Sequence, residues 1–139
     1  MNISFFFEDT PSFRFDRSMV KRWITTSITS ENKKAGDINF IFCSDDYLLK
    51  INRQYLSHDY FTDIITFDYV EKDIITGDVF ISIDRVKENS GIYNVSFQTE
   101  LHRVIIHGIL HLLGYHDKKP DDKILMTQKE DYYLSRLQS

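Results

Sequence analysis

The sequence predicts an α+β fold: a single domain over residues 1–139, with a mixed, mostly antiparallel sheet of about four to five strands packed against helices. The chain has 139 residues, of which 42% are hydrophobic, so it can bury one core and is not expected to be disordered. Segments with strand and helix periodicity both occur, but they do not alternate strictly. One helical segment is apolar nearly all round, so we expect it to be a central, buried helix.

The first half of the chain predicts two strands and two helices. Ile3–Glu8 is rich in β-forming residues, and Phe13 and Phe15 are expected to extend a second edge. A helix capped by Asp16 or Ser18 then runs to about residue 30, because its apolar residues repeat at helical spacing. After a turn at 33–37, Ile38–Cys43 forms an apolar strand. Ser44 is a good N-cap for the next helix, which ends near Leu56.

The second half predicts a pair of strands followed by three helices. Ile64–Tyr69 and Asp78–Ile83 have strand character and are joined by a charged loop at 71–76. A short helix near residues 84–90 precedes the long apolar helix at about 96–113. Asp121 or Asp122 is expected to start the last helix. The apolar residues expected to face inward from that helix are Ile124, Leu125, Tyr132 and Leu134.

The long helix carries two histidines, His107 and His111, four residues apart in an apolar run. Side chains at i and i+4 lie on one face of a helix, about 5–6 Å apart, so both imidazoles can reach one divalent metal ion. A buried polar side chain costs free energy unless it has a partner, and a metal ion is a partner for both. Gly114 can then end the helix and turn the chain back toward that ion. The spacing therefore predicts one metal ion per chain.

Two neighbouring residues compete to be the third ligand. The ligand spacing of metzincin hydrolases places this ligand three residues after the glycine, at Asp117, whereas His116 is the better zinc ligand by chemical type. Adjacent side chains of an extended segment point in different directions, so the two are not expected to face the metal equally. We predict that Asp117 is the ligand and that His116 lies beside the ligands or contacts the substrate.

The same motif differs from that of a metallopeptidase. Gly108 occupies the position of the peptidase glutamate base, and it cannot accept a proton. Three protein ligands leave one position open, as in catalytic zinc sites, and an aspartate ligand could also favour another divalent transition metal. No general base is evident, because Glu100 lies about 10 Å from His107 along the helix axis. Arg103 could contact phosphate or pair with Glu100.

Composition narrows the expected partners and compartment. The net charge is −4, which is not typical of a nucleic-acid-binding protein, so any polyanion must bind a local patch such as the lysines at 118, 119 and 123. The single cysteine, Cys43, excludes an internal disulfide, and we expect a small core residue in a reducing cytoplasm. No apolar run approaches the length of a membrane span, so no membrane partner is expected.

Polar residues also crowd two segments before the long helix. Thr62 and Asp63 lie where a loop enters a strand, and Gly77 and Asp78 do the same. Turn-forming or strand-capping roles are open to both aspartates. Beside a metal motif, Asp63 and Asp78 become candidates for lining a cleft against the metal helix.

Three motifs within about residues 36–117 match, in order and spacing, a pattern that ends in His-Gly-x-Leu-His-Leu-x-Gly-Tyr-Asp-His. The earlier parts of that pattern are Asn-x-x-Tyr-Arg-x-x-Asp-x-Pro-Thr-Asp-Val-Leu-Ser-Phe and Gly-Asp-Ile. The matching residues here are Asn52, Tyr55, Asp59, Thr62, Asp63, Phe67, Gly77, Asp78 and the run from His107 to Asp117. The chain thereby resembles the YbeY family of metal-dependent endoribonucleases. By position, the resemblance carries the family's three metal ligands to His107, His111 and Asp117.

The chain departs from this family pattern at three places. Leu56 stands where the family has an arginine, and Phe61 stands where it has a proline. The final Asp-His of the motif is reversed, as His116-Asp117. Near the missing arginine, Arg53 or His58 could take over its contact with RNA.

The resemblance implies a single-strand-specific, metal-dependent endoribonuclease that acts in ribosomal RNA processing, including 16S rRNA 3′-end maturation, and in ribosome biogenesis. It implies one Zn²⁺ or another divalent transition metal per chain, a precursor rRNA substrate, and the ribosome or small-subunit proteins as partners, with no role for DNA. Two alternatives come from other classes. One is a zincin-type zinc metallopeptidase. The other is a non-catalytic, metal-stabilised ribosome-associated binding domain, which His116 as a fourth ligand would favour.

Overall fold

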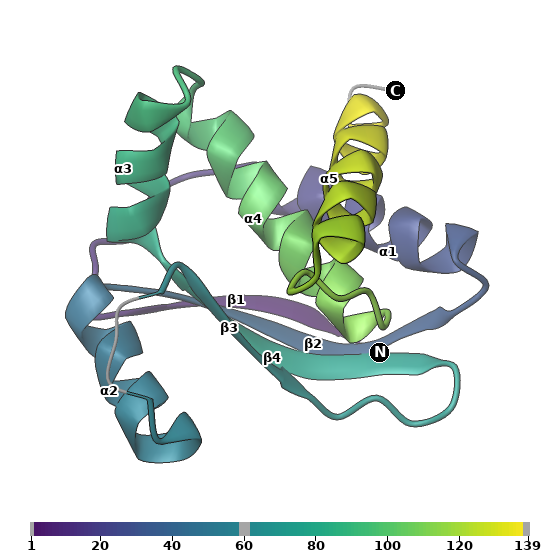
Figure 1. The fold of residues 1–139 in the computed structure, drawn as a ribbon, viewed down its shortest axis with the longest axis horizontal. Coiled ribbons are helices and arrows are strands. Elements are labelled where there is room, and N and C mark those ends of the chain that lie inside the picture. The colour runs from purple at the N-terminus through teal and green to yellow at the C-terminus, as the bar shows by residue number, and fades with distance from the viewer. Residues whose placement is uncertain (1, 59–61, 138–139) are drawn as a thin grey trace.

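The computed structural model describes residues 2–58 and 62–137. These residues contain five helices and four strands, joined by loops (Figure 1). The motif residues Asp59 and Phe61 lie outside these ranges. In chain order the elements are β1 (Ile3–Glu8), α1 (Arg17–Ser30), β2 (Lys34–Cys43), α2 (Asp45–Leu56), β3 (Ile64–Asp68), β4 (Ile74–Ser82), α3 (Ile83–Ile92), α4 (Phe97–Leu112) and α5 (Pro120–Ser135). The predicted α+β class and mixed sheet are confirmed, with four strands where about four to five were expected.

The sheet is mostly parallel, and the prediction of a mostly antiparallel sheet is wrong. The strand order is β1-β2-β4-β3, in which β2 pairs in parallel with both β1 and β4, and only β3 pairs antiparallel with β4. The connections explain this difference. Helix α1 returns the chain across the sheet between β1 and β2, so that both strands run in the same direction. Helix α2 and strand β3 together return the chain between β2 and β4, so that these two strands are also parallel.

Two segments predicted as loops are part of the sheet. The expected turn at 33–37 lies largely in β2, because Lys34 and Ala35 pair with Ile74 and Ile75 of β4. The charged loop expected at 71–76 is shorter for the same reason. An irregularity between Ala35 and Ile38 interrupts the pairing. Local composition predicts turns here, but the neighbouring strand supplies the backbone hydrogen bonds that decide the conformation.

The sheet carries helices on both faces. Helices α1, α3, α4 and α5 lie on one face, and α2 lies on the other (Figure 1). Helix α4 is at the centre of the larger layer and contacts β3, β4 and three of the other helices. Ten of its residues are buried, as expected for a helix that is apolar nearly all round. The metzincin-like ligand spacing further predicts that α4 is a zincin-like metal helix, and this part of the fold prediction stays a prediction.

Phe13 and Phe15 are not part of a strand. Instead, their rings pack over the sheet: Phe13 lies 5.1 Å from Phe7, and Phe15 lies 5.0 Å from Phe5, centroid to centroid. Phe13 also reaches Phe97 at the start of α4, 5.3 Å away. Edge-to-face pairs of this kind stabilise by about 0.5–1.5 kcal/mol beyond their buried area. The segment before α1 thus closes the core by side-chain packing.

Two glycines allow α4 to approach the sheet closely. A Cβ atom on Gly108 would lie 2.8 Å from Val79 Cγ1, and one on Gly77 would lie 2.5 Å from the Phe67 carbonyl oxygen and 2.9 Å from Leu112 Cδ2. All three distances are too short for a real Cβ atom. Position 108 therefore faces the sheet, and a larger side chain there would push the helix away from β4.

We expect Gly77→Ala to destabilise the fold by about 1–3 kcal/mol, because the added methyl group meets a backbone oxygen that cannot rotate away. Thermal unfolding should show a melting temperature several degrees lower. Gly91→Ala is the matched control, since a Cβ atom on Gly91 has no atom within 4 Å and the residue lies in α3. That variant should gain about 0.5–1 kcal/mol. Equal melting temperatures for the two variants would contradict the packing argument.

Candidate metal centre

Three side-chain atoms meet where α4 ends and the following loop turns back. The Nε2 atoms of His107 and His111 are 3.0 Å apart, and Asp117 Oδ2 lies 3.2 Å from the first and 3.4 Å from the second. Within residues 2–58 and 62–137, this is the one group of His, Cys, Asp or Glu side chains with the geometry to hold a metal ion. The structure thus brings together the three residues predicted as ligands.

The geometry and chemistry of this group fit a tetrahedral metal ion. Zinc–ligand distances of 2.0–2.2 Å place neighbouring ligand atoms about 3.3–3.6 Å apart, close to the separations found here. The Nδ1 atom of His107 lies 2.6 Å from Glu130 Oε2. If Nδ1 carries the proton and donates it to this carboxylate, Nε2 presents a lone pair. Lone pairs and a carboxylate oxygen facing one another repel unless a cation lies between them.

The turn after α4 directs Asp117 to the two histidines. Gly114 has φ +103°, and the N–H groups of Gly114 and Tyr115 donate to the carbonyls of His111 and Leu110, 3.0 Å each. This is the Schellman pattern, which favours glycine because of its left-handed backbone. His116 is exposed and outside the ligand group, whereas Asp117 is partly buried within it. The register after Gly114 therefore brings Asp117, and not His116, to the site.

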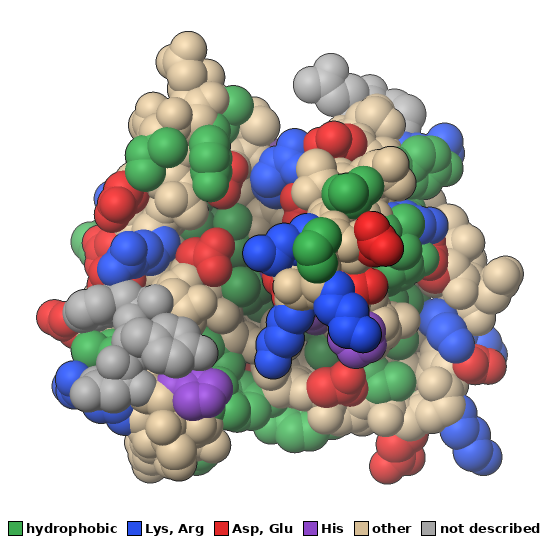
Figure 2. Space-filling model, in the orientation of Figure 1, with side chains coloured by type: hydrophobic (Ala, Val, Ile, Leu, Met, Phe, Trp, Pro, Cys, Tyr) green, Lys and Arg blue, Asp and Glu red, His purple; other side chains and the backbone are tan. Residues whose placement is uncertain are grey.

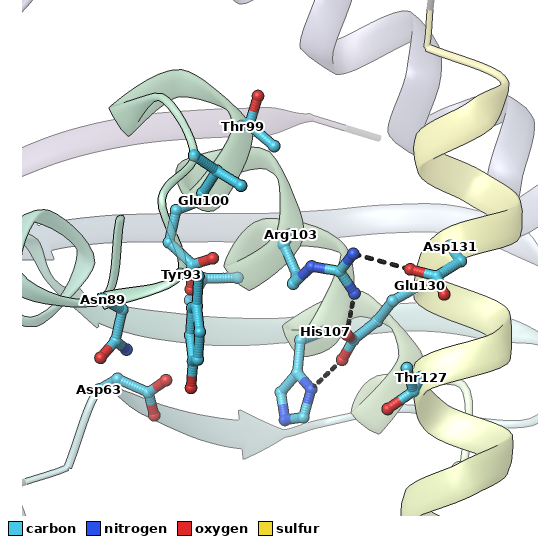
Figure 3. Close-up of a pocket in the computed structure, with 12 residues that line it drawn as sticks. Asp63, Asn89, Tyr93, Thr99, Glu100, Arg103, His107, Thr127, Glu130 and Asp131 are labelled. Carbon is cyan, nitrogen blue, oxygen red and sulfur yellow. Dashed lines mark hydrogen bonds and ion pairs between the residues drawn. The ribbon is translucent and has the colours of Figure 1, made fainter. Parts of the chain in front are cut away.

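Glu130 of α5 is hydrogen-bonded to His107 on the side of the ring away from the other two ligands, and the sequence does not predict this contact. Besides accepting from His107, Glu130 accepts from Arg103 at 2.8 Å, and Arg103 also donates to Asp131 at 2.7 Å (Figure 3). Burial lowers the pKa of His107, but the hydrogen bond and the charge of Glu130 outweigh it and raise the pKa. A carboxylate in this position fixes the ring orientation and tautomer of a metal-binding histidine.

Glu130 is absent from the predicted site because the prediction of which residues of α5 face inward is wrong. Ile124, Leu125 and Tyr132 are 58%, 42% and 50% exposed, and the buried residues are Met126, Glu130 and Tyr133. Of the predicted inward residues, Leu134 does pack against the core. The helix also begins at Pro120 rather than at an aspartate. A glutamate inside an apolar stripe is the one signal that could have revealed this residue.

A second polar cluster ties the ligand loop to the rest of the fold. Glu31, at the end of α1, accepts hydrogen bonds from Tyr115 at 2.6 Å, from Lys129 at 3.2 Å and from Tyr133. Burial of Glu31 opposes these donors, but together they lower the pKa of its carboxyl. Burial and the hydrogen bond to Glu31 raise the pKa of Tyr133 to about 12. The cluster anchors both the turn before Asp117 and the helix that carries Glu130.

A cleft of about 580 Å³ opens beside His107, between α3, α4 and α5. Its polar lining residues include Asp63, Asn89, Glu100, Arg103 and Glu130 (Figure 3). Asp63 therefore lies where the sequence predicts. Asp78 does not, because its side chain lies on the other face of the sheet and accepts from Asn39 at 3.0 Å. Strand alternation explains this, since its neighbours Gly77 and Val79 face α4.

Other candidate residues lie away from the metal group. Arg53 and His58 are exposed, at and just beyond the end of α2, on the opposite face of the sheet from α4. Leu56, at the position of the family arginine, is 39% exposed. Burial raises the pKa of Cys43 to about 12, helped by nearby acidic groups such as Asp45, so its thiol remains protonated. Cys43 is a core residue, as expected.

The chain is similar to known endoribonucleases over nearly its whole length. Residues 7–138 match the family model described as "Endoribonuclease YbeY". Proteins named endoribonuclease YbeY from Flavobacterium psychrophilum and Parabacteroides distasonis are 52% and 47% identical to it, over 95% and 99% of this chain and 94% and 96% of theirs. The solution structure of TM1509 from Thermotoga maritima superposes with a TM-score of 0.69, at 27% identity, covering 98% of this chain and 89% of that one.

Proposed function

The chain belongs to the endoribonuclease YbeY family, and we propose on that premise that it is a metal-dependent endoribonuclease that cuts single-stranded RNA during ribosomal RNA processing. The observation that carries the proposal is the meeting of His107, His111 and Asp117 next to a cleft that His107 lines. We further propose that the substrate is precursor rRNA, including the 16S rRNA 3′ end, that the compartment is the cytoplasm, and that the ribosome or its small-subunit proteins are partners.

We propose His107, His111 and Asp117 as the metal ligands and Zn²⁺ as the ion. When bound, such an ion supplies Lewis-acid activation of water and of a phosphodiester. The protein contributes orientation: Glu130 keeps His107 Nδ1 protonated and its Nε2 free to bind, and the Gly114 turn positions Asp117. Three protein ligands leave room for water and substrate, which is the arrangement of catalytic sites.

The same geometry disfavours both alternatives. A metallopeptidase needs a glutamate beside the first histidine, but position 108 faces Val79 and Ile64 of the sheet. A purely structural metal site is usually closed by four protein ligands, and His116 is exposed and outside the group. Within residues 2–58 and 62–137, no helix has both the length and the apolar character of a membrane span.

Chelation separates these functions. Zinc-loaded protein should cut a single-stranded RNA oligonucleotide and leave the same DNA sequence and a casein peptide intact. A chelator should abolish cleavage, and added zinc should restore it. The melting temperature should fall when the ion is removed, because the ion binds the native state. RNA cleavage that persists in full after metal removal would overturn the proposal, and peptide cleavage would favour the peptidase.

Basic side chains beside the metal centre are suited to contact the RNA backbone. Lys118 and Lys119 directly follow Asp117, Lys123 lies one turn into α5, and all three are exposed. Lys and Arg side chains gather over this part of the molecule, where the loop after α4 leads into α5 (Figure 2). We propose that these three lysines bind phosphates next to the scissile bond.

Replacing Lys118, Lys119 and Lys123 together by Ala should weaken RNA binding for all sequences alike. The slope of log affinity against log salt should fall by about 2, since each phosphate contact to a single strand contributes about 0.7. Binding isotherms at several salt concentrations measure this. The matched control replaces Lys21, Lys50 and Lys87, which are exposed on α1, α2 and α3. An equal loss in the control would show that only net charge matters.

A further inference from the structure

One carboxyl group in the cleft beside the metal centre, that of Glu100, accepts no hydrogen bond from the part of the chain that the structure describes. Glu100 of α4 is 5% exposed, and it lines the cleft together with His107. Among the residues that the structure describes, none donates a hydrogen bond to its side chain or forms an ion pair with it. Burial raises the pKa of Glu100, with the charge of Arg103 acting in the opposite direction. Because Glu100 lines the open cleft, its carboxylate oxygens can accept from a ligand there that presents N–H groups.

The charges around Glu100 favour a donor and disfavour a phosphate. Arg103 already binds Glu130 and Asp131, so its charge is matched. Asp63 lines the same cleft and adds a further negative charge. A metal ion is not favoured either, because Glu100 and Asp63 do not join a group with metal-binding geometry among the described residues. The cleft therefore suits a neutral group that presents N–H donors.

An aromatic ring lines the same cleft as Glu100. Tyr93, which follows α3, is 62% exposed and lines the cleft with Glu100 (Figure 3). Unpaired bases of single-stranded RNA stack on aromatic side chains and expose their Watson–Crick edges to hydrogen bonding. Glu100 and His107 are two helical turns apart, about 10 Å along the axis, so a base near Glu100 can belong to a nucleotide near the metal.

We propose that this cleft selects a guanine base next to the scissile phosphate, with the Glu100 carboxylate accepting from the N1–H and N2 amino groups and the Tyr93 ring stacking on the base. The inference rests on the proposed RNA cleavage. Guanine alone among the four RNA bases presents two adjacent donors on its Watson–Crick edge, which match the two carboxylate oxygens. Adenine and cytosine place an acceptor beside the amino group, and the N–H of uracil lies between two carbonyls.

Cleavage of a randomised RNA tests this selection. Zinc-loaded protein is incubated with single-stranded oligonucleotides that carry six randomised positions, and the product ends are sequenced. At one fixed position relative to the cut, guanine should be at least about fivefold more frequent in the products than in the starting RNA. This is the size expected for a base held by two hydrogen bonds. In Glu100→Gln the enrichment should disappear while cleavage continues, and in Tyr93→Ala cleavage should slow with all bases. Metal content and melting temperature confirm that each variant is folded and loaded.

A change in the substrate gives a second test that needs no variant. Inosine lacks the N2 amino group of guanosine, so its incorporation at the selected position should remove most of the preference. Equal cleavage with all four bases, or an unchanged preference in Glu100→Gln, would overturn the inference and leave RNA cleavage intact. No metal-dependent cleavage of any RNA would instead overturn the proposed function, and the inference with it.

Discussion

His111→Ala should empty the metal site and abolish RNA cleavage. Zinc sites with four ligands bind with about 10–16 kcal/mol, so one ligand accounts for roughly 3–4 kcal/mol. The affinity should therefore fall on the order of 100- to 1,000-fold. Elemental analysis and a competition titration with a chromogenic chelator measure the loss. Because metal binding stabilises the folded chain, the melting temperature of the variant should also approach that of the metal-free wild type.

The neighbouring residues provide the controls for this experiment. His116→Ala should keep the metal, since His116 is exposed and lies outside the ligand group. Asp117→Ala should lose it, as His111→Ala does. Asp117→His should retain it, because an imidazole restores the residue type that the family pattern has at this position and is itself a good zinc ligand. Should His116→Ala release the ion while Asp117→Ala stays loaded, the turn after Gly114 would have a different path. Equal loss in both would indicate four protein ligands and weaken the case for hydrolysis.

The parts of the site that could be predicted from the sequence depend on local geometry. His107 and His111 share one helical face by spacing alone, and Gly114 fixes the register of the next residues within one turn. The caps of the first two predicted helices are similarly local: the Asp16 and Ser44 side chains each accept from a backbone N–H three residues on. Such features need no information about the rest of the chain.

The parts that could not be predicted depend on distant segments. Glu130 meets His107 across 23 residues, and nothing in the sequence near either residue indicates the contact. The prediction that Asp78 lines a cleft against the metal helix is wrong. Which face of β4 Asp78 occupies depends on how β4 pairs with β2 and β3, and the sequence around Asp78 does not reveal that pairing. Strand β2 is parallel to β1 and β4 because the connections cross over the sheet, and hydrophobic periodicity does not show where a connection runs. Tertiary packing thus decides the contact of Glu130, the face of Asp78 and the direction of β2.

Glu130→Gln should weaken metal binding by about 10- to 100-fold while leaving all three ligands in place. The amide keeps the size of the side chain but loses the charge that holds His107 Nδ1 protonated and that binds Arg103. Glu130 is 7% exposed, so water cannot replace the lost interaction fully. A metal titration of the folded variant at low temperature measures the affinity, and single-turnover cleavage at saturating zinc measures what remains of the activity.

A matched control separates the positioning of His107 from general stabilisation by the same ion-pair network. Asp131 also binds Arg103, but its side chain is 60% exposed and does not contact His107. Asp131→Asn should therefore change stability by less than about 1 kcal/mol and leave the metal affinity unchanged. If Glu130→Gln lost stability but bound zinc as tightly as the wild type, Glu130 would serve the fold alone. Weak zinc binding in a variant that is still folded would instead show that α5 contributes to the metal centre through His107.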